Sequence, residues 1–214
     1  RSEDPARSRL YDAAWLAAAR EGGALLDRFS IELAILPETV IVPRKVRALG
    51  TRGTWTLAEL PVAPAASVLR GALWSVDPTN TLDLMYPTGG GTGVLRGTIV
   101  LRGSGPARPD LGPPLPCTIG RWEAGAIDVA CTTDADGYAA ISSASAPGWT
   151  ATVDGRETGW LTADVLRRAV PITAGTHTIA WRYRAPGLTF GLLAAVIAAL
   201  GLLAMVVAAR RARA

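Results

Sequence analysis

The segments WTATVD (149–154) and HTIAWRYR (177–184) decide the fold class of this chain of 214 residues. In each segment the residues at every second position, beginning with the first, are apolar or carry an aromatic ring. Alternation with a period of two is typical of a β-strand that buries one face. We therefore expect two half-buried strands, with Trp149 and Trp181 as core aromatics of opposing sheets.

Further short strands surround these two segments. The sequence predicts strands near residues 116–122, 126–132, 138–144, 149–154, 165–172 and 177–184. Short strands at a spacing of about ten residues, separated by turn signals such as Asp154-Gly155, are typical of a β-sandwich or jelly roll. We therefore expect a β-sandwich-like domain over residues 116–187. A linker rich in proline and glycine at 103–116 is interpreted as a subdomain boundary.

Residues 1–115 are expected to mix helix and strand. Leucine and alanine recur at helical spacing between residues 10 and 18, which predicts a helix that ends before Gly22-Gly23. The glycine run at 89–93 lacks the Gly-Lys-Ser/Thr ending of a phosphate-binding loop, so it is interpreted as a connector. Strands are expected at residues 31–36, 54–60, 67–76 and 94–102, and a turn is expected at residues 77–80.

An uncharged apolar run, LTFGLLAAVIAALGLLAMVVAA (188–209), follows the β-rich part. Roughly twenty apolar residues in a helix cross a hydrocarbon core about 30 Å thick, so this run predicts one transmembrane helix. Three arginines within residues 210–214 mark the cytoplasmic side by the positive-inside rule. We therefore expect residues 1–187 to be extracytoplasmic and residues 210–214 to form a basic cytoplasmic tail.

The formal net charge of +4 belongs mostly to that tail, because the tail arginines leave about +1 for the rest of the chain. No basic stripe with interleaved aromatic residues is present, so we expect no nucleic-acid partner. The chain opens with RSEDP, without an initiator methionine or an apolar signal segment. Export of this part therefore requires either a signal that was cleaved or upstream transmembrane helices of the same polypeptide. We expect the second, in which those helices contact this part in the membrane, because of the motifs at 146–156 and 174–183.

The two cysteines, Cys117 and Cys131, flank a segment that is typical of a β-hairpin. If residues 123–125 form its loop, each cysteine lies seven residues from Ala124, and the two oppose each other on paired strands. Such a pair can form a disulfide, which persists in oxidising compartments. A bulge that shifts the register by one residue would instead leave two free, buried cysteines.

The titratable residues do not form a catalytic or metal-binding pattern. The acidic residues are scattered, and Asp134–Gly137 lacks the third ligand and the closing glutamate of a calcium loop, so a tight turn is expected. His177, the only histidine, shares its strand face with Ile179 and Trp181 and is expected to be a core or sheet-end residue. We therefore expect no catalytic residue, no metal ligand and no cofactor in this chain.

Two motifs resemble the C-terminal end of YfhO-like bacterial membrane proteins. The segments APGWTATVDGR (146–156) and AGTHTIAWRY (174–183) are similar to motifs of that family in the same order, and an apolar helix follows at once, as it does there. The resemblance covers about residues 135–210. Members of this family are polytopic proteins with the architecture of lipid-phosphosugar-dependent glycosyltransferases of the GT-C class.

The resemblance implies that the parent protein transfers a sugar from a polyprenyl-phosphate donor at the outer face of the bacterial cell membrane, in many such enzymes with a divalent metal. The catalytic carboxylate of that class lies in the first outward loop near the N-terminus, and no such region is present in this chain. No catalytic residue is carried over. The chain is therefore expected to be a non-catalytic accessory domain that helps to position the acceptor.

Trp149, Asp154 and His177 are the candidate substrate-binding residues. Trp149 either packs in the core or stacks on a sugar beside the outer leaflet, and Asp154-Gly155 makes a two-residue hairpin turn. Two other functions stay open. One is a membrane-anchored carbohydrate-binding or cell-envelope interaction module, whose partner would be an envelope glycan or a lipid-linked sugar; the other is a purely structural ectodomain.

Overall fold

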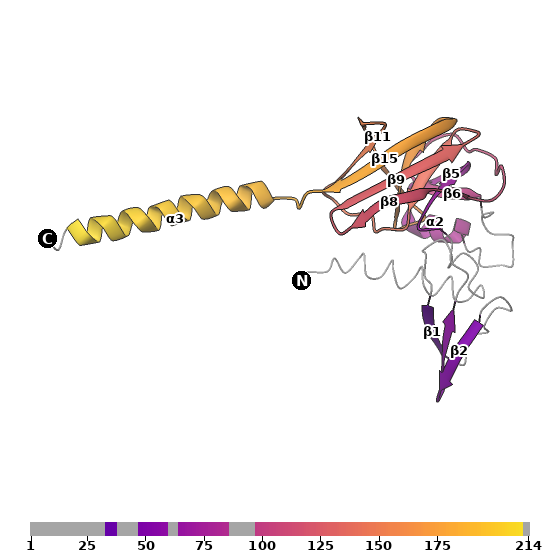
Figure 1. Ribbon diagram of the computed structural model, residues 1–214, viewed down its shortest axis with the longest axis horizontal. Helices are drawn as coiled ribbons and strands as arrows, with labels where there is room; N and C mark the ends of the chain where they lie inside the picture. Colours follow the sequence, from indigo (N-terminus) through magenta and orange to yellow (C-terminus); the bar gives the residue numbers. More distant parts are fainter. Residues whose placement is uncertain (1–32, 38–46, 60–63, 86–96, 212–214) are drawn as a thin grey trace.

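A computed structural model describes residues 33–37, 47–59, 64–85 and 97–211 (Figure 1). Within these residues the chain is mainly β, as predicted, with three sheets and two helices. The helix predicted before Gly22 and the glycine run at 89–93 lie outside the described residues.

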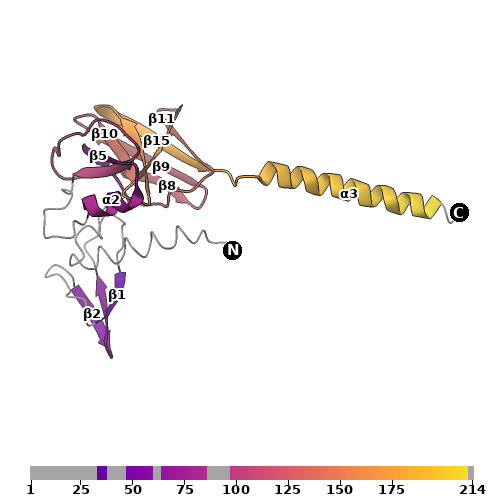
Figure 2. The same cartoon turned by 180° about the vertical axis from the view of Figure 1, so that it is seen from behind.

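Sheet A has the strand order β1-β3-β2 and lies apart from the other two sheets in both views (Figures 1 and 2). Its strands are β1 (Leu33–Pro37), β2 (Arg47–Arg52) and β3 (Trp55–Glu59). Strands β1 and β3 agree with the strands predicted at 31–36 and 54–60, whereas β2 was not predicted.

Sheet B has the strand order β5-β6-β13-β14-β10-β4-β7, in which only the β5–β6 pair is parallel. Its strands are β4 (Ala66–Leu69), β5 (Gly71–Ser75), β6 (Thr98–Arg102), β7 (Leu115–Pro116), β10 (Gly137–Ile141), β13 (Leu161–Ala163) and β14 (Arg167–Ile172).

Sheet C has the antiparallel order β12-β11-β15-β9-β8. Its strands are β8 (Thr118–Glu123), β9 (Ala126–Thr133), β11 (Trp149–Val153), β12 (Arg156–Thr158) and β15 (Gly175–Tyr183). The three-residue strands β12 and β13 were not predicted, because so short a segment shows too little alternation to be recognised.

Sheets B and C share the main hydrophobic core. Inward-facing apolar residues come from β4, β10 and β14 of sheet B and from β9, β11 and β15 of sheet C. They are Ala66, Val68, Ala139, Ile141, Val170 and Ile172 from sheet B, and Ile127, Val129, Cys131, Ala151, Ile179 and Trp181 from sheet C. On β11 and β15 the alternation in the sequence therefore corresponds to one face buried in this core, whereas β4 and β10 are buried on both faces.

Trp149 and Trp181 do not come from opposing sheets, so that prediction was wrong. Strand β11 pairs directly with β15, and Trp181 lies opposite Ala151 in the antiparallel register. Residues opposite each other in such a pair point to the same side of the sheet. Alternation reveals the face of a side chain but not the strand beside it, and both tryptophans therefore lie on the inner face of sheet C.

The strand predicted at 67–76 is two strands, β4 and β5, separated only by Arg70. Although they are adjacent in the chain, β4 pairs with β10 while β5 pairs with β6 at the other end of the sheet order. Sheet B therefore curls back on itself. Inside this curl lies a second apolar cluster: Leu69, Ala72, Ile99, Leu101, Tyr138, Ala140, Ala163 and Ala169.

Residues 103–116 cover part of this second cluster and do not separate two sheets. Arg108 forms a two-way backbone hydrogen-bonded bridge with Ala72 (3.1 and 2.8 Å), and its guanidinium lies 5.5 Å from the ring centroid of Tyr138. Gly105 lies so close to Trp74 that an added Cβ atom would come within 2.4 Å of the indole. Because sheet B takes strands from both sides of residue 115, the boundary expected there falls inside one sheet.

The turn predicted at 77–80 is the start of helix α2 (Pro78–Met85). The Asp77 carboxylate accepts a hydrogen bond from the Thr79 N–H at 2.9 Å, and the Asp77 carbonyl accepts one from the Thr81 N–H at 3.0 Å. Aspartate at the N-cap followed by proline at the first helical position is a common start of a helix. The same residue types also start turns, which explains the error.

Helix α3 (Leu188–Arg211) is 24 residues long and extends away from the sheets (Figure 1). Large apolar side chains along it are exposed, including Phe190 (80%) and Met205 (65%). Counted over the residues that the structure describes, no helix meets the combined requirements of length and apolarity for crossing a membrane.

Candidate functional site

The structure brings together two of the three candidate residues, Asp154 and His177. Asp154 follows β11 at the tip of the β11–β12 hairpin, where Asp154 and Gly155 both have positive φ angles (51° and 77°), as a type I′ turn requires. His177 lies on β15, with its Nδ1 atom 2.7 Å from the Asp154 Oδ2 atom. The other carboxylate oxygen, Oδ1, accepts a hydrogen bond from the Thr178 N–H at 2.8 Å.

These contacts tie the hairpin tip to the neighbouring strand. The hydrogen bond from the Thr178 N–H, and after it the one from the His177 side chain, hold the pKa of the Asp154 carboxyl below its ordinary value of 3.8, because both stabilise the charged form. His177 Nε2 lies 3.1 Å from the Thr173 carbonyl oxygen. Both ring nitrogens of His177 therefore face oxygen atoms of the chain. We call the contacts of Asp154 with His177 and Thr178, which hold the hairpin turn against β15, the clamp.

Trp149 lies at the opposite end of β11 and belongs to a different cluster. Its ring packs at a tilt against Tyr183, with 5.3 Å between ring centroids, and the Arg168 guanidinium carbon lies 3.6 Å from its centroid. Its carbonyl oxygen accepts a hydrogen bond from Trp160 Nε1 at 2.8 Å. Because Arg168 and Tyr183 already pack against the indole, the contacts favour the packing role of Trp149 over sugar stacking.

Arg168 is the most unusual member of this cluster, since its side chain is fully buried. Its guanidinium also lies 5.0 Å from the Trp181 ring centroid, and its Nη2 atom donates to the Ser143 hydroxyl at 2.7 Å. Burial lowers the pKa of Arg168 to about 10. The Arg168 Nε and Nη1 atoms and the Trp181 Nε1 atom are buried without a hydrogen-bond partner among the described residues. Cation–π contact with two indoles compensates part of that desolvation.

The sequence reading missed the residues that surround Trp149. Arg168 begins the alternation Arg168-Val170-Ile172, whose later members are core residues, and that pattern alone places its side chain on the inner face. Arg168 was not predicted as a core residue, because a buried arginine is rare. No local signal identifies Trp160 or Ser143, since each reaches the cluster from a loop.

The two cysteines form a disulfide, with 4.5 Å between their Cα atoms. The hairpin turn holds only Ala124 and Gly125, so Glu123 pairs with Ala126 and the register differs by one residue from the expected one. A bulge at Gly120 then shifts the register back, and Thr118 pairs with Ala130. The bulge therefore brings the cysteines opposite each other, whereas the sequence reading expected a bulge to separate them.

Three other acidic residues of the described chain accept hydrogen bonds that hold segments of the fold together. Asp134 accepts two hydrogen bonds from the buried Arg70 (2.9 and 3.2 Å), and Asp136 accepts one from the Ala174 N–H at 3.1 Å. Asp164 is fully buried and accepts a hydrogen bond from the Val100 N–H at 2.9 Å. Among the described residues, no group of three or more histidine, cysteine or carboxylate side chains could hold a metal ion.

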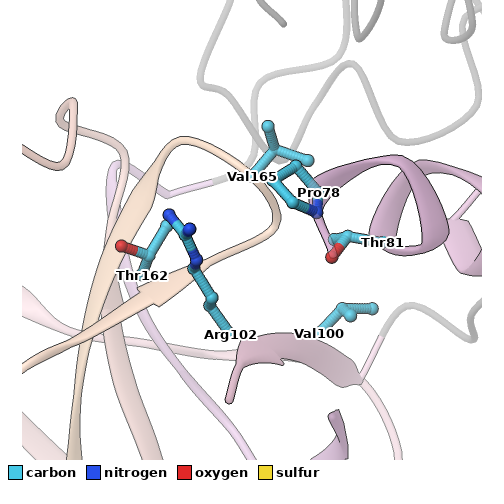
Figure 3. Close-up of a pocket in the computed structure, with 6 residues that line it drawn as sticks. All are labelled: Pro78, Thr81, Val100, Arg102, Thr162 and Val165. Atoms are coloured by element: carbon cyan, nitrogen blue, oxygen red, sulfur yellow. The ribbon is translucent and has the colours of Figure 1, made fainter. Parts of the chain in front are cut away.

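One small pocket lies between α2 and sheet B (Figure 3). Its cavity volume is about 30 Å³, which holds one or two waters but no sugar ring. Val165 has a φ angle of 72°, which is uncommon for a β-branched residue and follows from the tight turn next to the buried Asp164. The lining residues are Pro78, Thr81, Val100, Arg102, Thr162 and Val165.

No protein-family model, no curated protein and no solved structure matches this chain.

Proposed function

We propose that this chain is the extracytoplasmic C-terminal domain and last membrane span of a polytopic bacterial membrane protein that resembles lipid-phosphosugar-dependent glycosyltransferases. In this proposal the chain does no chemistry itself. It anchors and positions a β domain at the outer face of the membrane. The observation that carries the proposal is α3, an apolar helix that stands clear of the β domain (Figure 1).

The exposed surface of α3 needs an apolar environment. Ten of its described residues are exposed large hydrophobics, and they occur on all sides of the helix: Leu188, Phe190, Leu192, Leu193, Val196, Ile197, Leu200, Leu202, Leu203 and Met205. A helix that is hydrophobic all round is normally buried in a protein core or in a membrane. At about 1.5 Å per residue, the 24 residues of α3 extend about 36 Å. The proposal that they cross the bilayer rests on the uncharged apolar run at 188–209 in the sequence, since no helix among the described residues meets the requirements for a membrane span.

Two observations support the proposed orientation. Arg210 and Arg211 lie in the last turn of α3, and arginines beside a span favour the cytoplasmic side. The disulfide between Cys117 and Cys131 lies in the domain at the other end of α3, and disulfides are typical of oxidising compartments.

Support for the glycosyltransferase class comes from the sequence motifs around Trp149 and His177 alone. The polyprenyl-phosphate donor and any divalent metal would be bound by the upstream part of the parent protein, and we assign no residue of this chain to them. A carbohydrate-binding module is the other hypothesis, but the contacts around Trp149 do not favour it.

Flotation with lipid vesicles tests the proposal. The chain is reconstituted with phospholipid vesicles, washed at alkaline pH and centrifuged through a density gradient, and we expect it to float with the lipid. The variant Leu200→Arg places a charge in the middle of α3 and should sharply reduce flotation, because an arginine at mid-span costs about 3 kcal/mol. The matched control Leu188→Arg makes the same substitution at the first residue of the helix and should float like the wild type. If all three proteins stay in the aqueous fraction, the membrane proposal is wrong.

A further inference from the structure

Three chain segments meet where α3 leaves the β domain. The Tyr183 N–H, at the end of β15, donates to the carbonyl of Gly125 in the β8–β9 turn at 2.9 Å. The next N–H, that of Arg184, donates to the carbonyl of Gly148, just before β11, at 2.8 Å. The end of sheet C that carries these contacts is therefore the end that faces α3 (Figure 1).

Little chain separates this sheet end from the helix. Strand β15 ends at Tyr183, and helical hydrogen bonding begins at the carbonyl of Gly187, which accepts from the Gly191 N–H at 2.8 Å. Four residues span at most about 14 Å when fully extended. The Leu188 N–H also donates to the Ala185 carbonyl at 3.2 Å, which makes a turn and shortens the connection further. A bilayer around α3 would therefore bring its headgroup layer, roughly 5–8 Å thick on each side, to this sheet end.

Exposed aromatic side chains lie at this end of sheet C. Trp122, on β8 two residues before the turn, is 41% exposed, and Tyr183 is 39% exposed. Tryptophan and tyrosine are enriched at the membrane–water boundary, because an apolar ring and a polar N–H or O–H match the two sides of that boundary.

The charged side chains at the same end are mostly paired. Arg121 forms an ion pair with Glu123, and Arg182 forms one with Asp128. Arg184 is exposed and adds a positive charge to these balanced pairs. This sheet end is therefore weakly cationic and carries no net acidic charge that lipid phosphates would repel.

We propose that this sheet end, formed by Trp122, Tyr183 and Arg184, is a lipid-binding platform that rests in the headgroup layer of the outer leaflet. The rings of Trp122 and Tyr183 sit at the boundary with the acyl chains, and Arg184 binds lipid phosphates. The platform holds the β domain in a defined orientation above the leaflet, where a single flexible anchor would let it tilt. This inference rests on the proposed function, because it requires α3 to be in the bilayer.

Tryptophan quenching in vesicles tests the platform. The full chain is reconstituted in phosphatidylcholine–phosphatidylglycerol vesicles with a spin label on the lipid headgroup. The contribution of Trp122 is the difference between the wild type and Trp122→Phe. The matched control is Trp55→Phe, because Trp55 is also exposed (52%) but lies on sheet A. We expect the Trp122 contribution to be quenched at least about twofold more than that of Trp55.

A charge-reversal pair tests the role of Arg184. Arg184→Glu should lower the quenching of Trp122 toward the level of Trp55, since it adds repulsion from lipid phosphates. Arg156→Glu makes the same change at the hairpin tip, at the other end of β11, and should leave the quenching unchanged.

The outcomes separate the platform from the anchor. If the chain floats and Trp122 is quenched no more than Trp55, the platform is wrong and the proposed function stands. If the chain does not float, both are overturned. If Arg156→Glu lowers quenching as much as Arg184→Glu does, the contact is a general charge effect and the assignment to this sheet end fails.

Discussion

Replacing Arg168 by methionine should change the stability of the β domain by no more than about 1 kcal/mol, although the residue is charged, buried and in contact with two tryptophans. Methionine fills a similar volume and makes favourable contacts with aromatic rings. Ser143, which loses the donor, is only half-buried and can bond to water instead.

The expected magnitude follows from opposing effects of similar size. The lowering of the Arg168 pKa from 12.5 to about 10 corresponds to about 3 kcal/mol against the charged form in the folded state. Two cation–π contacts contribute about 0.5–2 kcal/mol each, and a hydrogen bond from a charged donor to Ser143 about 1.5–3 kcal/mol. The Trp181 contact is long, at 5.0 Å, and the Ser143 hydroxyl is half-buried, so we take the low end of each range. About 1 kcal/mol from the two cation–π contacts and about 1.5 kcal/mol from the hydrogen bond then offset most of the cost of about 3 kcal/mol, and the guanidinium changes the net stability by no more than about 1 kcal/mol. Arg168→Ala differs, because it also empties the site and should cost about 2–4 kcal/mol.

Arg167→Met is the matched control for this prediction. Arg167 is also buried, but its Nη1 atom lies 3.3 Å from the fully buried carboxylate of Asp164. Removing Arg167 takes the counter-charge from the buried Asp164 carboxylate, which keeps its hydrogen bond from the Val100 N–H, and loss of one member of a buried ion pair costs about 3–5 kcal/mol. The same substitution at adjacent positions of β14 should therefore have very different effects.

Thermal and urea unfolding of the full chain in detergent micelles measures these differences. For a domain of this size, 1 kcal/mol corresponds to a shift of roughly 2–4 °C in Tm. Arg168→Met should stay within that shift, whereas Arg168→Ala and Arg167→Met should fall well below the wild type. If Arg168→Met destabilises the domain as much as Arg167→Met does, the guanidinium makes a net stabilising contribution and the reasoning is refuted.

Three further predictions concern the disulfide and the two candidate clusters. Replacing both Cys117 and Cys131 by serine should lower the free energy of unfolding by about 3 kcal/mol, the value for a disulfide that closes a loop of about fifteen residues. Equal unfolding curves of the wild type with and without reductant would contradict this prediction. Because the folded pKa of Asp154 lies below its unfolded value of 3.8, its contribution is complete above pH 3.8 and is lost as pH falls through the folded pKa. Asp154→Asn should therefore flatten the loss of stability below pH 3.8, and an unchanged acid-unfolding profile would argue against the clamp. Trp149→Ala should cost about 2–3 kcal/mol and leave glycan binding, measured by titration calorimetry, unaltered; a fully stable variant that loses binding to an envelope glycan would establish the sugar-stacking role instead.

Alternation that reflects burial on one side identified only some of the predicted strands. Strands β11 and β15 each bury one face against the main core, and their patterns are visible in the sequence. Strand β10 has five buried residues in succession and β2 has six exposed ones, so neither shows alternation. The first was still expected from its turn signals, and the second was missed.

The three candidate residues were singled out in the sequence, but which of them lie together was not predicted. Asp154 and His177 were singled out from one motif each, and the pairing of β11 with β15 brings them to 2.7 Å. The same pairing puts Trp149 at the far end of the strand, beside Tyr183. Distance in the sequence does not reveal which strands become neighbours, so three residues expected at one site occupy two.

Three features follow from the amino-acid sequence alone: the protein is mainly β, its cysteines can meet in a hairpin, and an apolar helix follows the last strand. These are local properties, because period-two alternation, turn residues and an uncharged run need no knowledge of distant segments. Three other features are visible only in the folded chain: β11 and β15 share a sheet, the Gly120 bulge aligns the cysteines, and Arg168 is buried between two tryptophans. Each of these features depends on which strands lie next to each other in the sheets. That arrangement is set by the burial of apolar side chains from the whole core.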